Sequence, residues 1–160
     1  MSRSLFFSFA LPLMWDIIGI NSVAMTEPDY LAIIKERGQG ALDLKMGIEM
    51  LEVSPQRLVA RMPVEGNTQP IGLLHGGANV VLAESLGSIG TQLHAGPDRK
   101  IVGVDINATH HRSARSGLVT AVATPISLGK TLCSYEIVIT DESGQRTCTA
   151  RITCMILAEI

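Results

Sequence analysis

Apolar residues repeat at every second position along much of the chain. They alternate from Leu44 to Met50 and again from Leu58 to Met62, on either side of a turn at Ser54-Pro55. This period is typical of half-buried strands. The same alternation recurs later in four segments, at residues 101–110, 117–126, 131–140 and 146–157.

One long segment has helical spacing instead. Its apolar residues are four, three and four positions apart, at Leu82, Leu86, Ile89 and Leu93. The helix is expected to run from Gly77 to His94 and to be largely enclosed, because so little of its surface is polar. Small residues on another part of its surface would permit close approach of other backbone, at Ala83, Gly87 and Gly90.

The order of elements indicates an α+β fold. A short helix is expected over residues 28–38, followed by two strands, the long helix and four more strands, with a hairpin loop at residues 141–144. The simplest arrangement is an antiparallel meander that curls around the long helix. A chain of 160 residues fits one such domain, which we expect over residues 25–160.

The first 24 residues differ from the rest. Arg3 precedes an apolar run from Leu5 to Leu13, and Ser22-Val23-Ala24 resembles a signal-peptidase site. The run is too short to span a bilayer as a helix, and Met25 begins a segment that reads like an ordinary protein start. We therefore interpret residues 1–24 as an extension or a misplaced start and expect a cytoplasmic protein. A cleaved signal peptide, and hence export, is the less favoured alternative.

Composition restricts the classes of function. Charged residues make up 18% of the chain and the net charge is -2, so a nucleic-acid-binding surface is not expected, and neither is stable membrane insertion. The cysteines are odd in number and lack CxxC spacing, which argues against a disulfide framework and a zinc site. They share the apolar phase of the strands and are expected as small buried hydrophobes rather than nucleophiles, at Cys133, Cys148 and Cys154.

Candidate chemistry gathers where the long helix begins. Gln69 supplies an amide, His75 an imidazole, and Gly76-Gly77 an unobstructed backbone. The first N–H groups of a helix lack intrahelical partners and lie at the positive end of its dipole, so a carbonyl oxygen could bind there and gain charge during attack. Each residue alone has a structural explanation. Together with Glu84 they indicate a site, because an acid on an apolar helix is costly unless it is paired or used.

Helix geometry separates Glu84 from that turn. It lies seven residues after Gly77, which is roughly 10 Å of helix rise. We therefore expect Glu84 to act with the His75–Gly77 turn of a second subunit, so that a two-fold dimer has two equal sites. Ser88, one turn further on, could bond the carboxylate or a water molecule. A monomer would leave the site incomplete, while dimer and tetramer both remain open.

Residues 69–88, QPIGLLHGGANVVLAESLGS, resemble the active-site segment of hotdog-fold acyl-CoA thioesterases. The similarity is to the branch of 4-hydroxybenzoyl-CoA, phenylacetate-pathway and 1,4-dihydroxy-2-naphthoyl-CoA thioesterases. Residues 104–114 resemble that branch too, and the likeness covers about residues 40–157. The resemblance implies a hotdog fold, in which an antiparallel sheet wraps around one long central helix. It also implies a homo-oligomer that hydrolyses an acyl-CoA to the free acid and CoA without a metal or redox cofactor.

The resemblance also implies catalytic roles. Glu84 would be the nucleophile or the general base that directs water at the thioester carbon, and the N–H of Gly76 or Gly77 would bind the carbonyl oxygen. Gln69 and His75 would position the thioester or the water. Ser88 occupies a place where the branch often has a hydroxyl near the carboxylate.

Substrate-binding candidates lie further along the chain. His110 is in the apolar phase of its strand, so it either faces the pocket or is a buried, hydrogen-bonded histidine. Arg112 and Arg115 could meet the phosphates of CoA or could be solvated surface residues. Gly129 and Lys130 are further candidates for the same task. The acyl group itself depends on pocket shape, and the few aromatic residues near the motif suit either an aryl or a medium alkyl group.

Two other functions stay open at this point. A related hotdog hydratase or dehydratase also pairs a histidine with a carboxylate for proton transfer, although the nine residues from His75 to Glu84 favour the thioesterase. The other alternative is a non-catalytic acyl-CoA-binding module. No helix-turn-helix segment or basic arm in the sequence supports a regulatory protein of that kind.

Overall fold

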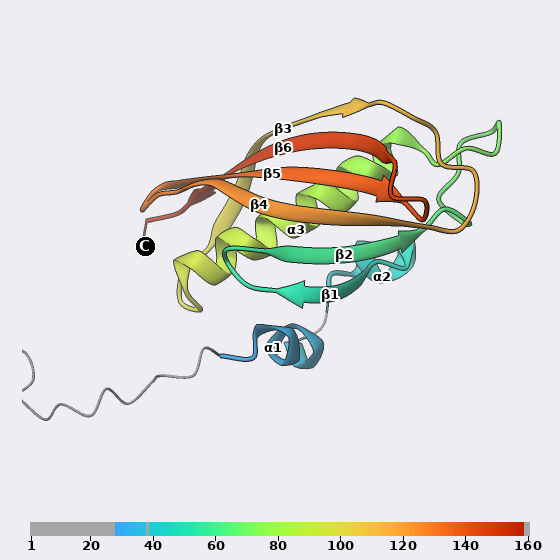
Figure 1. Ribbon diagram of the computed structural model, residues 1–160. Helices are drawn as coiled ribbons and strands as arrows, with labels where there is room; N and C mark the ends of the chain where they lie inside the picture. The colour runs from blue at the N-terminus through green and yellow to red at the C-terminus, as the bar shows by residue number, and fades with distance from the viewer. Residues whose placement is uncertain (1–27, 38, 159–160) are drawn as a thin grey trace, which may run out of the picture.

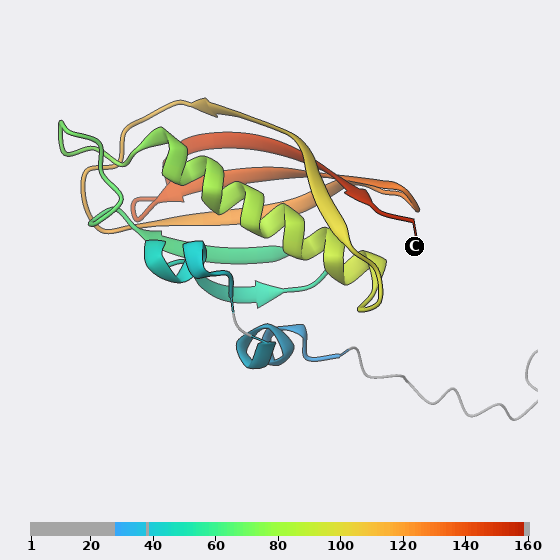
Figure 2. The ribbon, with the colours of Figure 1, turned by 180° about the vertical axis from the view of Figure 1, so that it is seen from behind.

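A six-stranded sheet curved around one long helix forms the body of the protein. The computed structural model describes residues 28–37 and 39–158, so the expected extension over residues 1–24 lies outside it. The elements are α1 (Tyr30–Arg37), α2 (Ala41–Met46), β1 (Glu49–Val53), β2 (Leu58–Pro63), α3 (Gly76–Ala95), β3 (Ile101–His110), β4 (Leu118–Leu128), β5 (Leu132–Asp141) and β6 (Arg146–Ile156). The sheet is in front in Figure 1, and Figure 2 shows α3 along its concave side from behind. No helix in the described ranges is long and apolar enough to cross a membrane.

The strand order corrects the expected simple meander. Every described strand pair is antiparallel, as predicted, but the order is β1-β2-β4-β5-β6-β3. Only the β1-β2 and β4-β5-β6 runs are meanders. The helix α3 lies across the concave face and delivers the chain to the far edge, where β3 pairs with β6. β3 is therefore an edge strand, and the chain returns across the sheet to place β4 beside β2.

The prediction of a strand from Leu44 to Met50 is wrong over its first half. Residues 41–46 form the short helix α2, which ends at Gly47 in the left-handed conformation with φ of 70°. The Gly47 N–H closes this end by donating to the Leu44 carbonyl, a common way to end a helix. Leu44 is consequently 64% exposed, whereas Ile48 and Met50 are buried as the alternation predicted.

Small residues of α3 mark where the sheet comes closest to the helix. Gly87 lies against the Ile152 side chain, and a Cβ on Gly90 would lie 2.7 Å from Cζ of Tyr135. The close approach therefore occurs at Gly87 and Gly90, but side chains are the neighbours and not the backbone that was expected. The helix is largely enclosed, as expected, since Gly77, Glu84 and His94 are the only exposed residues of α3.

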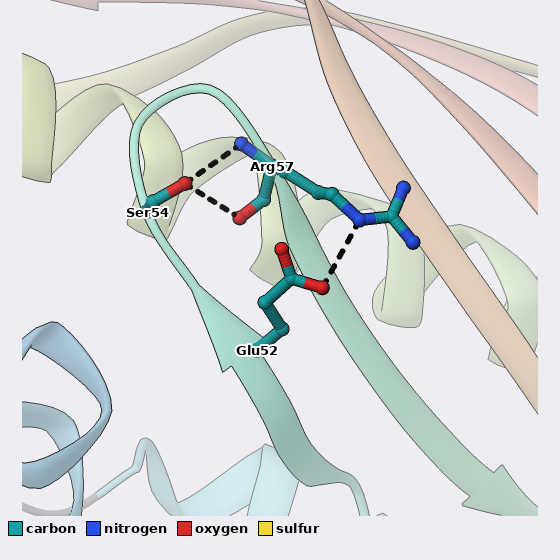
Figure 3. Close-up of polar contacts among 3 residues, drawn as sticks. All are labelled: Glu52, Ser54 and Arg57. Carbon is teal, nitrogen blue, oxygen red and sulfur yellow. Dashed lines mark hydrogen bonds and ion pairs between the residues drawn. The ribbon is translucent and has the colours of Figure 1, made fainter.

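The predicted turn at Ser54-Pro55 is the β1–β2 hairpin (Figure 3). The Ser54 hydroxyl accepts from the Arg57 N–H at 3.0 Å and donates to the Arg57 carbonyl at 3.1 Å, while Arg57 Nε donates to Glu52 at 3.0 Å. That ion pair is exposed and contributes little. The buried Tyr135 hydroxyl donates to the Pro55 carbonyl at 2.7 Å and ties the hairpin to β5.

The predicted hairpin loop at residues 141–144 is closed by Asp141. Its Oδ1 accepts from the Ser143 hydroxyl at 2.6 Å and from the Ser143 and Gln145 N–H groups, each at 3.0 Å. Hydrogen bonds to the ionised form hold the pKa of the Asp141 carboxyl below its usual range, the Ser143 hydroxyl being the largest cause.

The cysteines are small buried core residues, as predicted. Cys133, Cys148 and Cys154 are free thiols buried on β5 and β6. Burial raises the pKa of the Cys133 and Cys148 thiols. A thiol that stays protonated is a poor nucleophile, so these two residues are unsuited to nucleophilic catalysis.

Replacing Gly87 by alanine is expected to destabilise the protein, although alanine is the better helix former. The new methyl group would collide with Ile152, and overpacking costs about 1–3 kcal/mol against about 1 kcal/mol gained in helix propensity. Urea unfolding should give a lower free energy of unfolding for Gly87→Ala. Gly40→Ala is the matched control, because nothing lies within 4 Å of a Cβ there. Equal stability of the two variants would contradict the close packing.

Candidate active site

The loop between β2 and α3 is held by polar contacts that fix where α3 begins. The Asn67 side-chain amide donates to the Met46 carbonyl at 2.8 Å and to the Pro63 carbonyl at 2.9 Å. The Asn67 carbonyl accepts from the His75 N–H at 2.8 Å. Asn67 was not singled out from the sequence. Its contacts join the loop to α2 and β2, so they fix the start of α3 relative to both elements.

His75 caps α3. Its backbone is extended, with φ of -67° and ψ of 132°, and its Nδ1 accepts from the Gly77 N–H at 2.9 Å. The accepting nitrogen carries no proton, so the neutral ring has its proton on Nε2. Within residues 28–37 and 39–158 no group accepts from the Gly76 N–H. Of the two glycines expected to bind a carbonyl oxygen, Gly76 is therefore the one with an available donor.

A cavity of about 440 Å³ opens beside Gly76. Its wall comes from the loop before α3, the first turn of α3, and the end of β3 with the segment that follows. The residues that matter chemically are Gln69, Gly76, Asn79, His110 and Arg112. The structure thus brings together four of the residues singled out in the sequence and adds Asn79.

The His110 ring packs against Gly76. A Cβ on Gly76 would lie only 2.8 Å from His110 Nε2, so this position needs glycine for the ring to stand there. His110 is exposed at the cavity. Of the two placements expected for it, this is the one in which it faces the pocket. On the far side of the ring, Asn79 Nδ2 lies 3.5 Å from His110 Nδ1. Sequence reasoning missed Asn79, although a polar side chain on the buried face of an apolar helix was the available signal.

Glu84 lies apart from this cavity. Its Oε1 would be 3.3 Å from a Cβ on Gly103, and it lines a smaller cavity of about 180 Å³ over β3. Eight residues of helix separate it from Gly76, or about 12 Å of rise. Within one chain the carboxylate and the open N–H therefore face different cavities.

Ser88 contacts β6 rather than Glu84. Its hydroxyl lies 3.9 Å from the Cys154 sulfur, and no hydrogen bond joins it to Glu84 in the part of the chain that the structure describes. The neighbouring Ser85 donates at 2.7 Å to the buried Asp43 carboxylate of α2. This bond fastens α2 to the middle of α3.

The candidate CoA-binding residues divide between the two ends of α3. Arg112 lines the cavity beside Gly76, whereas Arg115 is exposed and is not part of its wall. Gly129 and Lys130 lie in the β4–β5 turn, where the Gly129 carbonyl contacts His94 Nε2 at 3.1 Å. His94 is in the last turn of α3, about 27 Å of helix rise from its start. One chain therefore does not bring Lys130 together with Arg112.

A further cavity of about 490 Å³ lies on the other side of the capped turn. It is lined by α2, the loop before α3 and the first turns of α3, with Leu42, Met46 and Val81 as apolar walls and Lys45 beside them. Both His75 and Gly77 border it. The start of α3 therefore stands between two cavities.

Comparison with known proteins identifies the family. Residues 71–148 match the sequence model of the Thioesterase superfamily. The chain is 43% identical over 128 residues to the 1,4-dihydroxy-2-naphthoyl-CoA hydrolase of Escherichia coli, which covers 79% of this chain and 94% of that protein. The chain belongs to the thioesterase superfamily. This thioesterase is also 41% identical to the proofreading thioesterase EntH of Klebsiella pneumoniae, over 79% of this chain and 93% of that protein.

Solved structures confirm the hotdog fold of this thioesterase. A thioesterase from Pseudomonas aeruginosa superposes with a TM-score of 0.76 at 38% identity, covering 83% of this chain and 96% of that one. One from Haemophilus influenzae gives 0.75 at 38% identity, covering 79% and 90%. The protein is therefore a thioester hydrolase, and the antiparallel sheet around α3 is the expected fold.

Replacing the His75 cap is expected to destabilise this thioesterase by about 1 kcal/mol in His75→Ala, because the Gly77 N–H loses its acceptor. His75→Asn should retain most of the stability, since its side-chain oxygen can accept the same bond. Thermal or urea unfolding measures the difference. If both variants are as stable as the wild type, the bond between Nδ1 and the Gly77 N–H does not stabilise the helix.

Proposed function

We propose that the protein hydrolyses an acyl-CoA to the free acid and CoA at sites shared between two subunits. The observation that carries the proposal is the separation of two chemical groups along α3. The open Gly76 N–H borders one cavity and the exposed Glu84 carboxylate borders another, about 12 Å of helix apart. Neither half is sufficient alone, because hydrolysis needs the carbonyl polarised and attacked at one carbon.

The Gly76 N–H binds the thioester oxygen in this proposal. It lies at the positive end of the α3 dipole, and a donor aimed at a developing oxyanion is worth about 10²–10³ in rate. The Gly77 N–H is already bonded to His75, so His75 acts on the helix terminus rather than on the substrate oxygen. Gln69 borders the same cavity and positions the thioester or the water.

Glu84 supplies the attack on the thioester carbon. As a general base it removes a proton from water while the water oxygen bonds to that carbon, and the C–S bond then breaks to release CoA. As a nucleophile its own oxygen bonds to the carbon, CoA leaves, and water hydrolyses the resulting anhydride. The exposed carboxylate is compatible with both routes, which share the same product.

The edge strand β3 supports a dimer. Val102 and Val104 are 44% and 56% exposed on it, and an unpaired apolar edge is a template for pairing with another chain. Antiparallel pairing of two β3 strands about a two-fold axis brings the Gly103 end of one strand toward the His110 end of the other. Glu84 lies beside Gly103 and Gly76 lies beside His110, so this pairing brings Glu84 toward Gly76 of the partner subunit. A tetramer would be two such dimers.

The substrate is proposed as an aryl or medium-chain acyl-CoA. Relatives carry the names 1,4-dihydroxy-2-naphthoyl-CoA hydrolase and proofreading thioesterase, which favours hydrolysis over the hydratase and the non-catalytic alternatives. Arg112 borders the cavity beside Gly76 and is suited to a CoA phosphate. Because CoA thioesters are held inside cells, this substrate favours a cytoplasmic enzyme.

Glu84→Gln is expected to lower kcat by about 10²–10⁴-fold with little change in KM, because the amide keeps the shape but neither accepts the proton nor attacks. Thiol release from benzoyl-CoA and octanoyl-CoA measures it. Glu52→Gln is the matched control, since Glu52 forms only an exposed ion pair in the β1–β2 hairpin. A wild-type rate in Glu84→Gln would remove the carboxylate from the mechanism.

Mixed dimers test whether the site is shared. Glu84→Gln and Gly76→Ala should each be nearly inactive alone, the latter because its methyl group displaces His110. A heterodimer of the two variants keeps one intact site and should recover about half of the wild-type rate per dimer. The control pairs the wild type with a chain carrying both changes, and that heterodimer should be inactive. The reverse pattern would mean that each site lies within one chain.

A further inference from the structure

Asn79 is an amide in a position where the helix otherwise buries apolar groups. It is 5% exposed on the face of α3 that also buries Ala78, Leu82 and Ala83. An unpaired buried polar group costs about 1–3 kcal/mol. Its Oδ1 has no hydrogen-bond partner within the described residues, and its Nδ2 faces one group, the His110 ring, at 3.5 Å. Packing alone therefore gives no reason for an amide here.

The two nitrogens of His110 have different surroundings. Nδ1 faces the buried Asn79 amide. Nε2 lies at the Gly76 backbone, where a Cβ would stand only 2.8 Å away. The ring thus links the buried amide to the backbone position whose N–H is proposed to bind the thioester oxygen. Which nitrogen carries the proton decides whether Nε2 can donate to that oxygen or would repel it.

We propose that Asn79 is a positioning residue that fixes the tautomer of His110. The Asn79 Nδ2–H donates to His110 Nδ1, so the neutral ring carries its proton on Nε2 and presents a donor beside the Gly76 N–H. This inference rests on the proposed function, in which the thioester oxygen binds at Gly76, and it gives that oxygen a second donor. At 3.5 Å the bond is long, and catalytic hydrogen bonds commonly tighten in the substrate complex.

The energetics of Asn79 point the same way. A donor–acceptor bond from the amide to Nδ1 leaves Oδ1 buried and unpaired, so the arrangement lowers stability relative to an apolar residue of the same size. Residues that serve a site rather than the fold commonly carry such a cost. A purely structural Asn79 would instead stabilise the protein, which separates the two roles experimentally.

The tautomer is measured directly by NMR of the full-length protein labelled with ¹⁵N-histidine, at alkaline pH where the rings are neutral. Of the four histidines, His110 is assigned by its loss in His110→Gln. The wild type is expected to carry the His110 proton on Nε2, and Asn79→Asp, which has the same shape but can only accept, should move it to Nδ1. A proton on Nδ1 in the wild type, or a tautomer that Asn79→Asp leaves unchanged, would overturn the proposal.

Asn79→Leu tests the role in turnover. It should unfold at the same or higher urea concentration than the wild type, while kcat for benzoyl-CoA falls by up to about 10²-fold, the upper limit being complete loss of one oxyanion donor, with KM little changed. In the NMR experiment, Gln56→Glu controls for the negative charge that Asn79→Asp adds. It is an exposed change in the β1–β2 turn. Loss of stability with unchanged kcat would assign Asn79 to the fold alone. The tautomer and the stability are measured without turnover, so this proposal and the proposed role of Glu84 can fail separately.

Discussion

The rise of the helix α3 sets the distance between the two groups on which the proposed chemistry depends. Gly76 and Glu84 lie on α3, and eight residues of helix keep them about 12 Å apart. No side-chain rotation closes that distance. A carbonyl held at the first turn of α3 can therefore be attacked by Glu84 only if a second copy of the helix supplies it. In the proposed dimer, the exposed edge of β3, with Glu84 beside it, is the part of the fold that meets this demand.

The glycines of α3 serve two different purposes. Gly87 and Gly90 let the helix settle onto Ile152 and Tyr135, and Tyr135 in turn holds the β1–β2 hairpin through the Pro55 carbonyl. These contacts fix the position of α3 against the sheet. Gly76 instead makes room for a histidine from another element, because any side chain there would meet His110. Glycine lowers helix propensity at all three positions. At Gly87 and Gly90 it allows close packing, and at Gly76 it leaves room for His110 beside the backbone.

Local patterns predicted most of the elements and the segment that lines the candidate site. The helix expected from Gly77 to His94 is α3 to within one residue at each end, and the strand over residues 101–110 is β3. The position of β3 at the edge of the sheet could not be predicted from its own residues. It depends on where the chain leaves α3 and pairs with β6. A register shift between Gly103 and Asp105 breaks the alternation expected over residues 101–110, and Val102 and Val104 are exposed on this edge strand. Asn67 and Asn79 were missed because folding brings their partners near. Asn67 bonds the Met46 and Pro63 carbonyls, and Asn79 faces the His110 ring.

The choice of histidine as the cap of α3 follows from the chemistry proposed beside it. Three N–H groups begin this helix: the Gly77 N–H is bonded to His75 Nδ1, the Ala78 N–H to the His75 carbonyl at 2.9 Å, and Gly76 borders the cavity. Aspartate is a favoured capping residue in general. Its negative charge would lie next to an oxygen that becomes negative during attack, and would oppose the stabilisation that the helix terminus provides. A neutral imidazole satisfies the second N–H of the helix without that charge, so the same terminus can be capped for stability and still receive an oxyanion.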